Sequence, residues 1–293
     1  MRMMKRTVLS LLSATLMLGS VASHANSPAY VDSKEYKVLV DPTRFASNPS
    51  SAAATLLTNL SARLSTLGFD KTITGNFAAG DRDTLAYYDT PGTCPLNKRG
   101  YSVRTRAGDD TDIQFKFRHA DEELSYWTDV SGAGKNKETK LETDVTPGNL
   151  VLAHSTKQDA TTTPTTVAAL IKLFPGASAL SDVSTSSLSK VAGVTVTQQE
   201  YDGPVSDIGE SVAEFTLTLW YIDGAATPAL AELSFRVDAD ADKYFTTPVL
   251  TRSQTLNTAI GSIGNGWNIA NDGGKTSWLY AYRSSSYPSG FCN

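Results

Sequence analysis

The chain has 293 residues, of which 40% are hydrophobic and 19% are charged, and its formal net charge is −4. This is the composition of an ordinary globular protein, long enough for a sizeable core in one large domain or two small ones. A net acidic chain is poorly suited to general binding of nucleic acid, and that class of function is set aside.

The first 25 residues have the pattern of a secretory signal peptide. Residues 1–6 are basic, residues 7–21 are apolar, and small residues allow cleavage after Ala25. We expect a signal peptide over residues 1–25, a mature domain over residues 26–293, and a secreted or periplasmic protein; an uncleaved anchor is the alternative. Cleavage removes three basic residues and no acid, so the formal charge goes from −4 to −7. No later apolar run is long enough to cross a bilayer.

The first half of the chain consists mostly of short segments in which apolar and polar residues alternate, which predicts strands with one apolar and one polar face. A leucine repeat predicts a helix over residues 50–67. Strands are expected over residues 33–40, 71–77, 84–89, 101–106, 113–118 and 126–144, the last with a turn inside it.

The second half begins with a Thr/Pro tract at residues 161–166, which is expected to be a loop or linker. Helices are expected over residues 167–174 and 253–263, and strands over residues 193–201, 214–222, 230–237 and 278–283. Many short antiparallel strands whose polar faces point one way indicate an α+β protein, mainly antiparallel β, closed or nearly closed into a tunnel-like barrel with a few covering helices. A sheet with a packed interior and a polar exterior is the alternative.

The hairpin at residues 101–118 carries four cations on one face: Arg104, Arg106, Lys116 and Arg118. If its turn is centred near Asp110, Arg104 lies opposite Lys116 and Arg106 lies opposite Gln114. Like charges directly opposed across a sheet are destabilising. The hairpin therefore predicts an anionic group among these cations, although each of them could also be a solvated surface charge.

The order of these features resembles the CYTH family, also called triphosphate tunnel metalloenzymes. The resemblance covers roughly residues 33–282, and its matching segments are Glu35-Tyr36-Lys37, residues 87–91 (YYDTP), residues 99–106 (RGYSVRTR) and residues 115–118 (FKFR). It implies a closed eight-stranded antiparallel tunnel in which cations hold phosphates and acids hold a divalent metal. It also implies an activity on triphosphates, such as that of the inorganic, thiamine and RNA triphosphatases or of one class of adenylate cyclase.

The resemblance and the alternation together give candidate site residues. Six cations are expected to bind phosphate, because Arg offers paired hydrogen bonds and Lys a point charge: Lys37, Arg104, Arg106, Lys116, Arg118 and Arg236. Five acids are expected to hold Mg²⁺ or Mn²⁺, unless they serve only as counter-ions: Glu35, Glu142, Asp144, Glu214 and Glu232. Glu35 and Lys37 are also expected to be catalytic.

The two cysteines of the chain, Cys94 and Cys292, predict one disulfide in an oxidising compartment; two free thiols are the alternative. The predicted function is binding of a triphosphate, polyphosphate or related organic phosphate, with metal-dependent hydrolysis at a degenerate site. Ser33 stands where the family has its first glutamate. A non-catalytic anion-binding or structural β-barrel protein of the cell envelope is therefore the alternative. The expected partner is a small phosphorylated anion.

Overall fold

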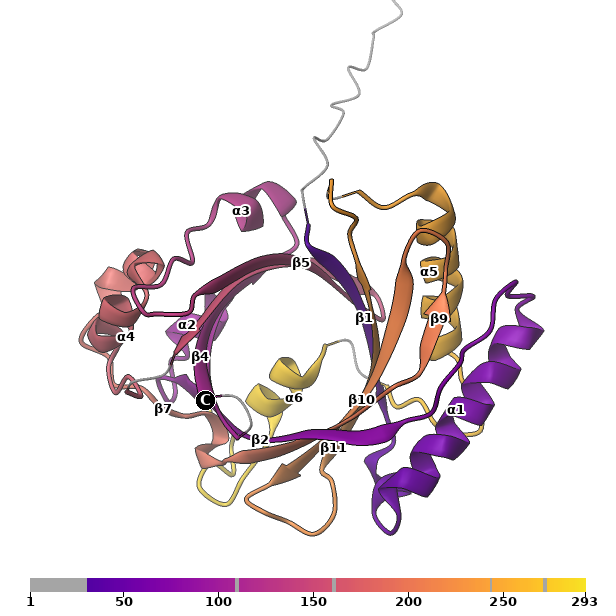
Figure 1. Cartoon of the computed structure of the whole chain (residues 1–293). Coiled ribbons are helices and arrows are strands. Elements are labelled where there is room, and N and C mark those ends of the chain that lie inside the picture. The colour runs from indigo at the N-terminus through magenta and orange to yellow at the C-terminus, as the bar shows by residue number, and fades with distance from the viewer. Residues whose placement is uncertain (1–30, 109–110, 160–161, 243, 271–272) are drawn as a thin grey trace, which may run out of the picture.

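The computed structural model describes residues 31–108, 111–159, 162–242, 244–270 and 273–293. The predicted signal peptide and its cleavage site lie outside the described residues. Within them, one sheet closes on itself into a barrel (Figure 1), because β10 pairs with β11 as well as with β8. The ring order is β11-β1-β5-β6-β4-β3-β2-β8-β10. The predicted closed barrel is confirmed, with nine strands in the ring instead of eight.

The strands of the ring are mostly antiparallel, and β1 runs parallel to β5. Their bounds are β1 (Ser33–Val40), β2 (Ala78–Asp89), β3 (Tyr101–Ala107), β4 (Thr111–His119), β5 (Glu138–Thr146), β6 (Asn149–Asp159), β8 (Val196–Asp202), β10 (Val212–Ile222) and β11 (Leu230–Asp238). Two short strands, β7 (Ser189–Lys190) and β9 (Val205–Asp207), pair at the edges of β2 and β10.

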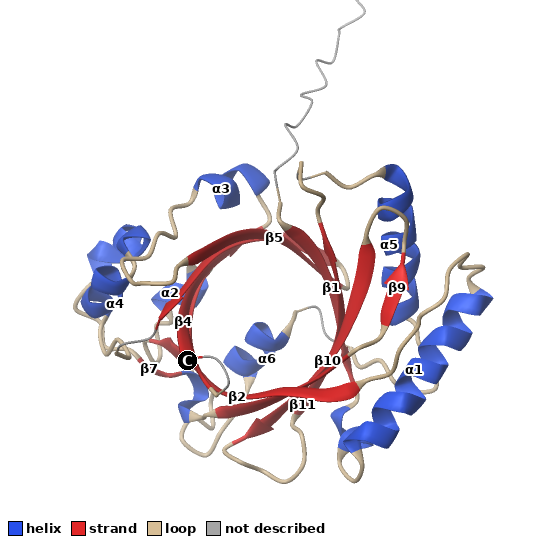
Figure 2. Cartoon of the chain, viewed as in Figure 1, coloured by secondary structure: helices blue, strands red, loops and turns tan. Residues whose placement is uncertain are grey.

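Helices cover the outside of the barrel, and one lies within it (Figure 2). On one side lie α1 (Pro49–Thr66) and α5 (Thr247–Ile260), and on the other lie α3 (Glu122–Trp127) and α4 (Val167–Leu173). The inner helix is α6 (Lys275–Ala281). The remaining helices are α2 (Pro95–Lys98), η1 (Pro42–Phe45), η2 (Pro175–Val183) and η3 (Val191–Gly193). No described helix is long and apolar enough to cross a membrane.

The alternation of β1 shows why the polar faces point inward. Tyr36, Val38 and Val40 are buried in the cluster that α1 and α5 cover, and the Tyr36 ring stacks on Phe235 with centroids 4.6 Å apart. Burying an apolar side chain of this size stabilises the fold by about 1.5–3 kcal/mol. Because successive side chains on a strand alternate, the outward apolar residues leave Glu35 and Lys37 inside the ring.

The register predicted for the cationic hairpin is wrong. Arg104 pairs with Gln114, Arg106 with Asp112, and Lys116 with Ser102. The last pair before the turn is Ala107 with Thr111, so the turn is centred one residue earlier than expected. In this register each cation faces a neutral or acidic residue, which avoids like charges directly opposed.

Two predicted strands are wrong, and the strand predicted over residues 126–144 is wrong in its first part, since only residues 138–144 belong to β5. Residues 126–137 form the end of α3 and a loop, because Asp121 caps the helix by accepting a hydrogen bond from the Leu124 N–H. Residues 71–77 contain one isolated bridge, between Thr74 and Val205. Residues 278–283 include most of α6. A segment inside a closed ring has no free sheet edge to pair with, and a helix satisfies its own backbone groups. The sequence did not predict β6.

Candidate functional site

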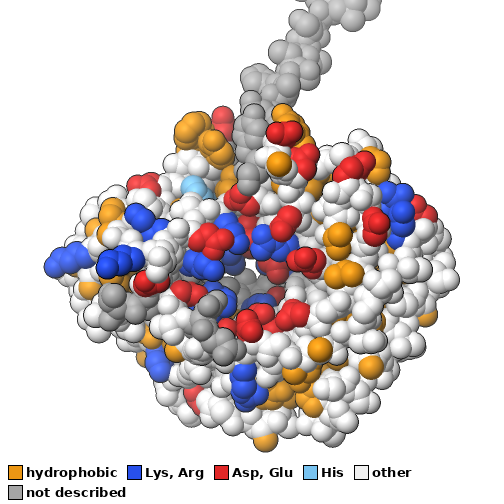
Figure 3. Space-filling view, in the orientation of Figure 1, with side chains coloured by type: hydrophobic (Ala, Val, Ile, Leu, Met, Phe, Trp, Pro, Cys, Tyr) orange, Lys and Arg blue, Asp and Glu red, His pale blue; other side chains and the backbone are white. Residues whose placement is uncertain are grey.

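A polar cavity of about 530 Å³ lies inside the barrel. Basic and acidic side chains gather around a hollow at this position (Figure 3). The described residues that line it give it a formal charge of +3, in a chain whose charge is −4. The basic ones are Lys37, Arg104, Arg106, Lys116, Arg118, Lys140, Lys157, Arg236 and Lys275, and the acidic ones are Glu35, Glu138, Glu142, Asp144, Glu200 and Glu232. Such a cavity concentrates anions, since protein walls focus the field of its charges.

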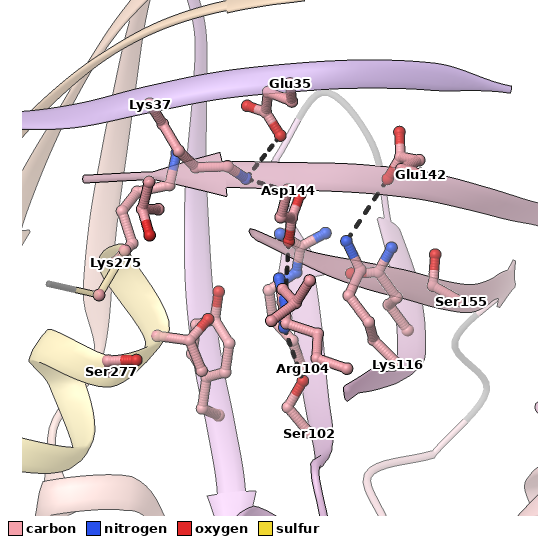
Figure 4. Close-up of a pocket in the computed structure, with 18 of the residues that line it drawn as sticks. Glu35, Lys37, Ser102, Arg104, Lys116, Glu142, Asp144, Ser155, Lys275 and Ser277 are labelled. Carbon is pink, nitrogen blue, oxygen red and sulfur yellow. Dashed lines mark hydrogen bonds and ion pairs between the residues drawn. The ribbon is translucent and has the colours of Figure 1, made fainter. Parts of the chain in front are cut away.

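Lys37 lies at the centre of the densest group of charges (Figure 4). Its Nζ is 2.7 Å from Glu35 Oε2 and 2.9 Å from Asp144 Oδ1, and Arg118 Nε donates to Asp144 Oδ2 at 2.8 Å. Burial would lower the pKa of Lys37, but Asp144 and Glu35 outweigh it and raise that pKa above the ordinary lysine value. Burial would raise the pKa of Asp144, but Lys37 and Arg118 hold that pKa far below its usual range. The ammonium and both carboxylates are therefore charged at neutral pH.

Glu142 joins a second, looser group. Lys116 Nζ is 3.6 Å from Glu142 Oε2, Arg236 Nη1 is 3.8 Å from Oε1, and the Ser33 hydroxyl donates to Oε1 at 3.2 Å. Burial and then the nearby charge of Arg118 lower the pKa of Lys116 below its ordinary value. The positive charge of Lys116 is thus only partly compensated, and an anion beside it would raise its pKa again.

Within the described part of the chain, Arg104 is a cavity cation whose guanidinium lacks a partner. Its Nε is buried and has no hydrogen-bond partner among the described residues, and its guanidinium forms no ion pair with them. Arg106 differs, with Asp83 at 3.4 Å and Asp112 at 3.6 Å. A buried donor without a partner costs about 1–3 kcal/mol, and more when it is charged. This position therefore favours an anionic group supplied from outside the chain.

Tyr87 faces Arg104 across β2 and β3 and also lines the cavity. Burial would raise the pKa of its phenol, but the charges of Arg104, Lys275 and Arg118 lower that pKa below its ordinary value. The phenol is thus a hydrogen-bond donor held in a field of cations, which suits a phosphate oxygen. The sequence marked Tyr87 only as part of a turn motif.

Helix α6 supplies another cation to the cavity from inside the ring. Lys275 Nζ is 2.7 Å from Glu232 Oε1, and the Lys275 N–H donates to Glu232 Oε2 at 3.3 Å. Burial would lower the pKa of Lys275, but Glu232 raises that pKa above the ordinary value. The sequence did not predict Lys275 as a site residue, and the sequence feature that could have indicated it is weak. Gly274 before it adjoins the same carboxylate, and a Cβ there would make an ordinary contact with Glu232 Oε2 at 3.5 Å.

The segment that carries α6 is fastened to the β2–β3 connection. The predicted disulfide between Cys94 and Cys292 is confirmed, with the Cα atoms 5.4 Å apart. The Tyr280 hydroxyl donates to Asp89 Oδ2 at 3.1 Å, and the Asn97 N–H donates to the same oxygen at 2.9 Å. Burial raises the pKa of Asp89. These contacts hold α6 inside the barrel.

The structure brings together all but one of the residues predicted for the site. The predicted residues that line the cavity are Glu35, Lys37, Arg104, Arg106, Lys116, Arg118, Glu142, Asp144, Glu232 and Arg236. Glu214 is exposed and lies outside the lining. Charged residues that line the cavity but were not predicted for the site are Glu138, Lys140, Lys157, Glu200 and Lys275. Alternation along β5 and β6 could have found Glu138, Lys140 and Lys157.

The acids predicted to hold Mg²⁺ or Mn²⁺ do not fit a metal in this arrangement. Lys37 Nζ bridges Glu35 and Asp144, and Lys275 Nζ contacts Glu232. Within the described part of the chain, no three His, Cys, Asp or Glu side chains gather in a metal-binding group. These hard cations need several oxygen ligands of their own, and lysine ammonium groups already hold these carboxylates.

No protein-family model and no curated protein matches the chain. Solved structures do. A Hippeastrum protein, described as a candidate adenylyl cyclase with a dominant triphosphatase activity, is 12% identical over 84% of this chain and 93% of its own, with a TM-score of 0.40. A candidate adenylate cyclase from Bacillus halodurans is 13% identical over 84% of this chain and 98% of its own, with a TM-score of 0.37. A Pyrococcus horikoshii protein is 9% identical over 82% of this chain and 94% of its own, with a TM-score of 0.33. These structures are thus only distantly similar to this chain. At such low scores they assign no activity to this chain.

Proposed function

We propose that this protein binds a triphosphate, a polyphosphate or a related organic phosphate inside its barrel. The observation that carries the proposal is the guanidinium of Arg104, whose buried Nε has no hydrogen-bond partner among the described residues. It faces a cavity with a formal charge of +3. Lys116, whose pKa is lowered by burial and by Arg118, is a second cation that gains from an anion.

The chemistry of the lining matches such a ligand. A polyphosphate concentrates several negative charges in a short chain, and recognition needs several cations at fixed positions. Arg104 offers paired N–H donors, Lys116 a point charge, and Tyr87 a hydroxyl donor, all on the cavity wall. A cavity of about 530 Å³ is also within the size range of small-molecule sites, roughly 300–1,000 Å³.

The test is calorimetric titration of the protein with sodium tripolyphosphate, with and without Mg²⁺, for the wild type and Arg104→Ala. Hydrogen bonds to charged groups contribute about 1.5–3 kcal/mol, so Arg104→Ala should weaken binding roughly tenfold or more. The matched control is Arg283→Ala, which removes an exposed arginine outside the lining. Absence of binding under both conditions, or equal affinity in the two variants, refutes the proposal.

Metal-dependent hydrolysis of a phosphoanhydride remains a prediction from the sequence. Release of phosphate from tripolyphosphate with Mg²⁺ or Mn²⁺ would support it. Binding without turnover is the second candidate, and the observation that favours it is the pairing of Glu35, Asp144 and Glu232 with lysines. Secretion or export to the periplasm also remains a prediction, and the N-terminal residue of the exported protein checks it.

A further inference from the structure

We infer that the cavity takes its polyphosphate as the free anion, because lysine ammonium groups hold the carboxylates that a divalent metal would need. The inference deepens the proposed function, on which it rests, and it differs from the metal-dependent site that the sequence resemblance implies. Two lysines carry it, Lys37 on β1 and Lys275 on α6.

Lys37 occupies the position between two carboxylates. Its Nζ lies 2.7 Å from Glu35 Oε2 and 2.9 Å from Asp144 Oδ1, which are distances of charge-assisted hydrogen bonds. The side chains of Lys37 and Asp144 are 11% and 6% exposed. A metal that bridged Glu35 and Asp144 would have to expel this ammonium. Removing one partner of a buried pair is strongly unfavourable, since it leaves an uncompensated charge.

Lys275, on α6, pairs in the same way with Glu232 on β11, the strand next to β1. Its Nζ contacts Oε1 at 2.7 Å and the hydroxyl of Thr218 at 3.3 Å, and its N–H reaches Oε2 at 3.3 Å. Glu232 therefore has an ion pair at Oε1 and a hydrogen bond at Oε2, and its side chain is 1% exposed. Freeing Oε1 for a metal requires the Lys275 ammonium to leave it, and freeing Oε2 requires movement of α6, which Tyr280 fastens to Asp89.

The charge that remains after this pairing decides which form of the ligand binds. The nine cations of the lining outnumber its six acids, which leaves a formal charge of +3. A Mg²⁺ complex of tripolyphosphate carries two fewer negative charges than the free anion. The cations therefore attract the complex less, and Mg²⁺ competes with the protein for the ligand.

The test is a calorimetric titration with tripolyphosphate in EDTA and again in excess Mg²⁺. We expect tight binding in EDTA and an apparent Kd roughly tenfold higher in Mg²⁺. Binding that requires Mg²⁺ overturns this inference and leaves the proposed function standing. Binding in neither buffer refutes the proposed function and this inference with it.

A variant set provides a second readout, the binding of Mn²⁺ alone, followed by electron paramagnetic resonance. Lys275→Gln frees Glu232 and should gain affinity for Mn²⁺ over the wild type. The double variant Glu232→Gln/Lys275→Gln should lose that gain. Lys172→Gln is the matched control, because Lys172 is exposed on α4, outside the lining. A wild type that itself binds Mn²⁺ tightly in the absence of ligand contradicts the inference, whether or not a variant folds.

Discussion

The substitution Asp144→Asn tests the charge group at the centre of the cavity. It keeps the shape of the side chain and removes the carboxylate that Lys37 and Arg118 share at 2.9 and 2.8 Å. The Asp144 side chain is 6% exposed, so water compensates the two cations poorly. We expect the free protein to be less stable and its response to tripolyphosphate to be larger, because the cavity gains one positive charge.

The decrease in the free energy of unfolding caused by Asp144→Asn depends on the contacts that Lys37 and Arg118 keep. Breaking a buried ion pair costs about 3–5 kcal/mol. Lys37 keeps Glu35 at 2.7 Å and the Arg118 side chain is 29% exposed, which places the loss at the lower end, about 3 kcal/mol. At roughly 2–4 °C per kcal/mol for a chain of this size, the Tm should fall by about 6–12 °C.

The assay is thermal unfolding at pH 7 with and without tripolyphosphate. The control Asp182→Asn breaks an ion pair with Arg99 in which the two side chains are 60% and 39% exposed, and it should change the Tm little. Because the pKa of Asp144 is depressed in the folded protein, its contribution is complete above its unfolded pKa of about 3.9 and disappears as the pH falls through its folded value. A Tm loss no larger than that of Asp182→Asn, or one that persists undiminished in acid, would refute this account of the charge group.

Three further outcomes are expected. Replacement of Cys94 and Cys292 by serine opens a link with a sequence separation of 198, and chemical denaturation should show a loss of about 5 kcal/mol. The pKa of Lys116 is lowered below the usual lysine value of about 10.4, so affinity for tripolyphosphate should fall as the pH rises through that lowered pKa. The Lys116→Arg variant should keep its affinity over the same pH range. A wild-type affinity that does not change with pH would contradict this. Tyr280→Phe removes a hydrogen bond to buried Asp89 and should cost about 1 kcal/mol in urea unfolding, and no loss would argue against the fastening of α6.

The fold was predictable where one face of a strand is apolar and the other charged. β1 coincides with its predicted range, and the hairpins of β3 with β4 and of β10 with β11 are present. These segments alternate clearly because the helices cover one face and the cavity lies on the other. The prediction failed for α6, whose aromatic residues alternate like those of a strand. Its conformation depends on its place inside a closed ring, which is not encoded locally.

The site residues that lie on alternating strands were also predictable from the sequence, and the site residue that depends on the tertiary fold was not. Lys37, Arg104 and Lys116 were found because period-two spacing places cations on one face of a strand. Lys275 was missed because its pairing with Glu232 joins residues 43 positions apart through the fold of the C-terminal segment. The hairpin register could not be read from composition either, because a shift of the turn by one residue changes every facing pair.

The most direct measurement is a crystal structure of the protein soaked with tripolyphosphate in the presence of EDTA. The account predicts a phosphate chain inside the barrel, in contact with Arg104 and Lys116. An empty barrel with phosphate only on the outer surface, at a ligand concentration that saturates the thermal response, would contradict it.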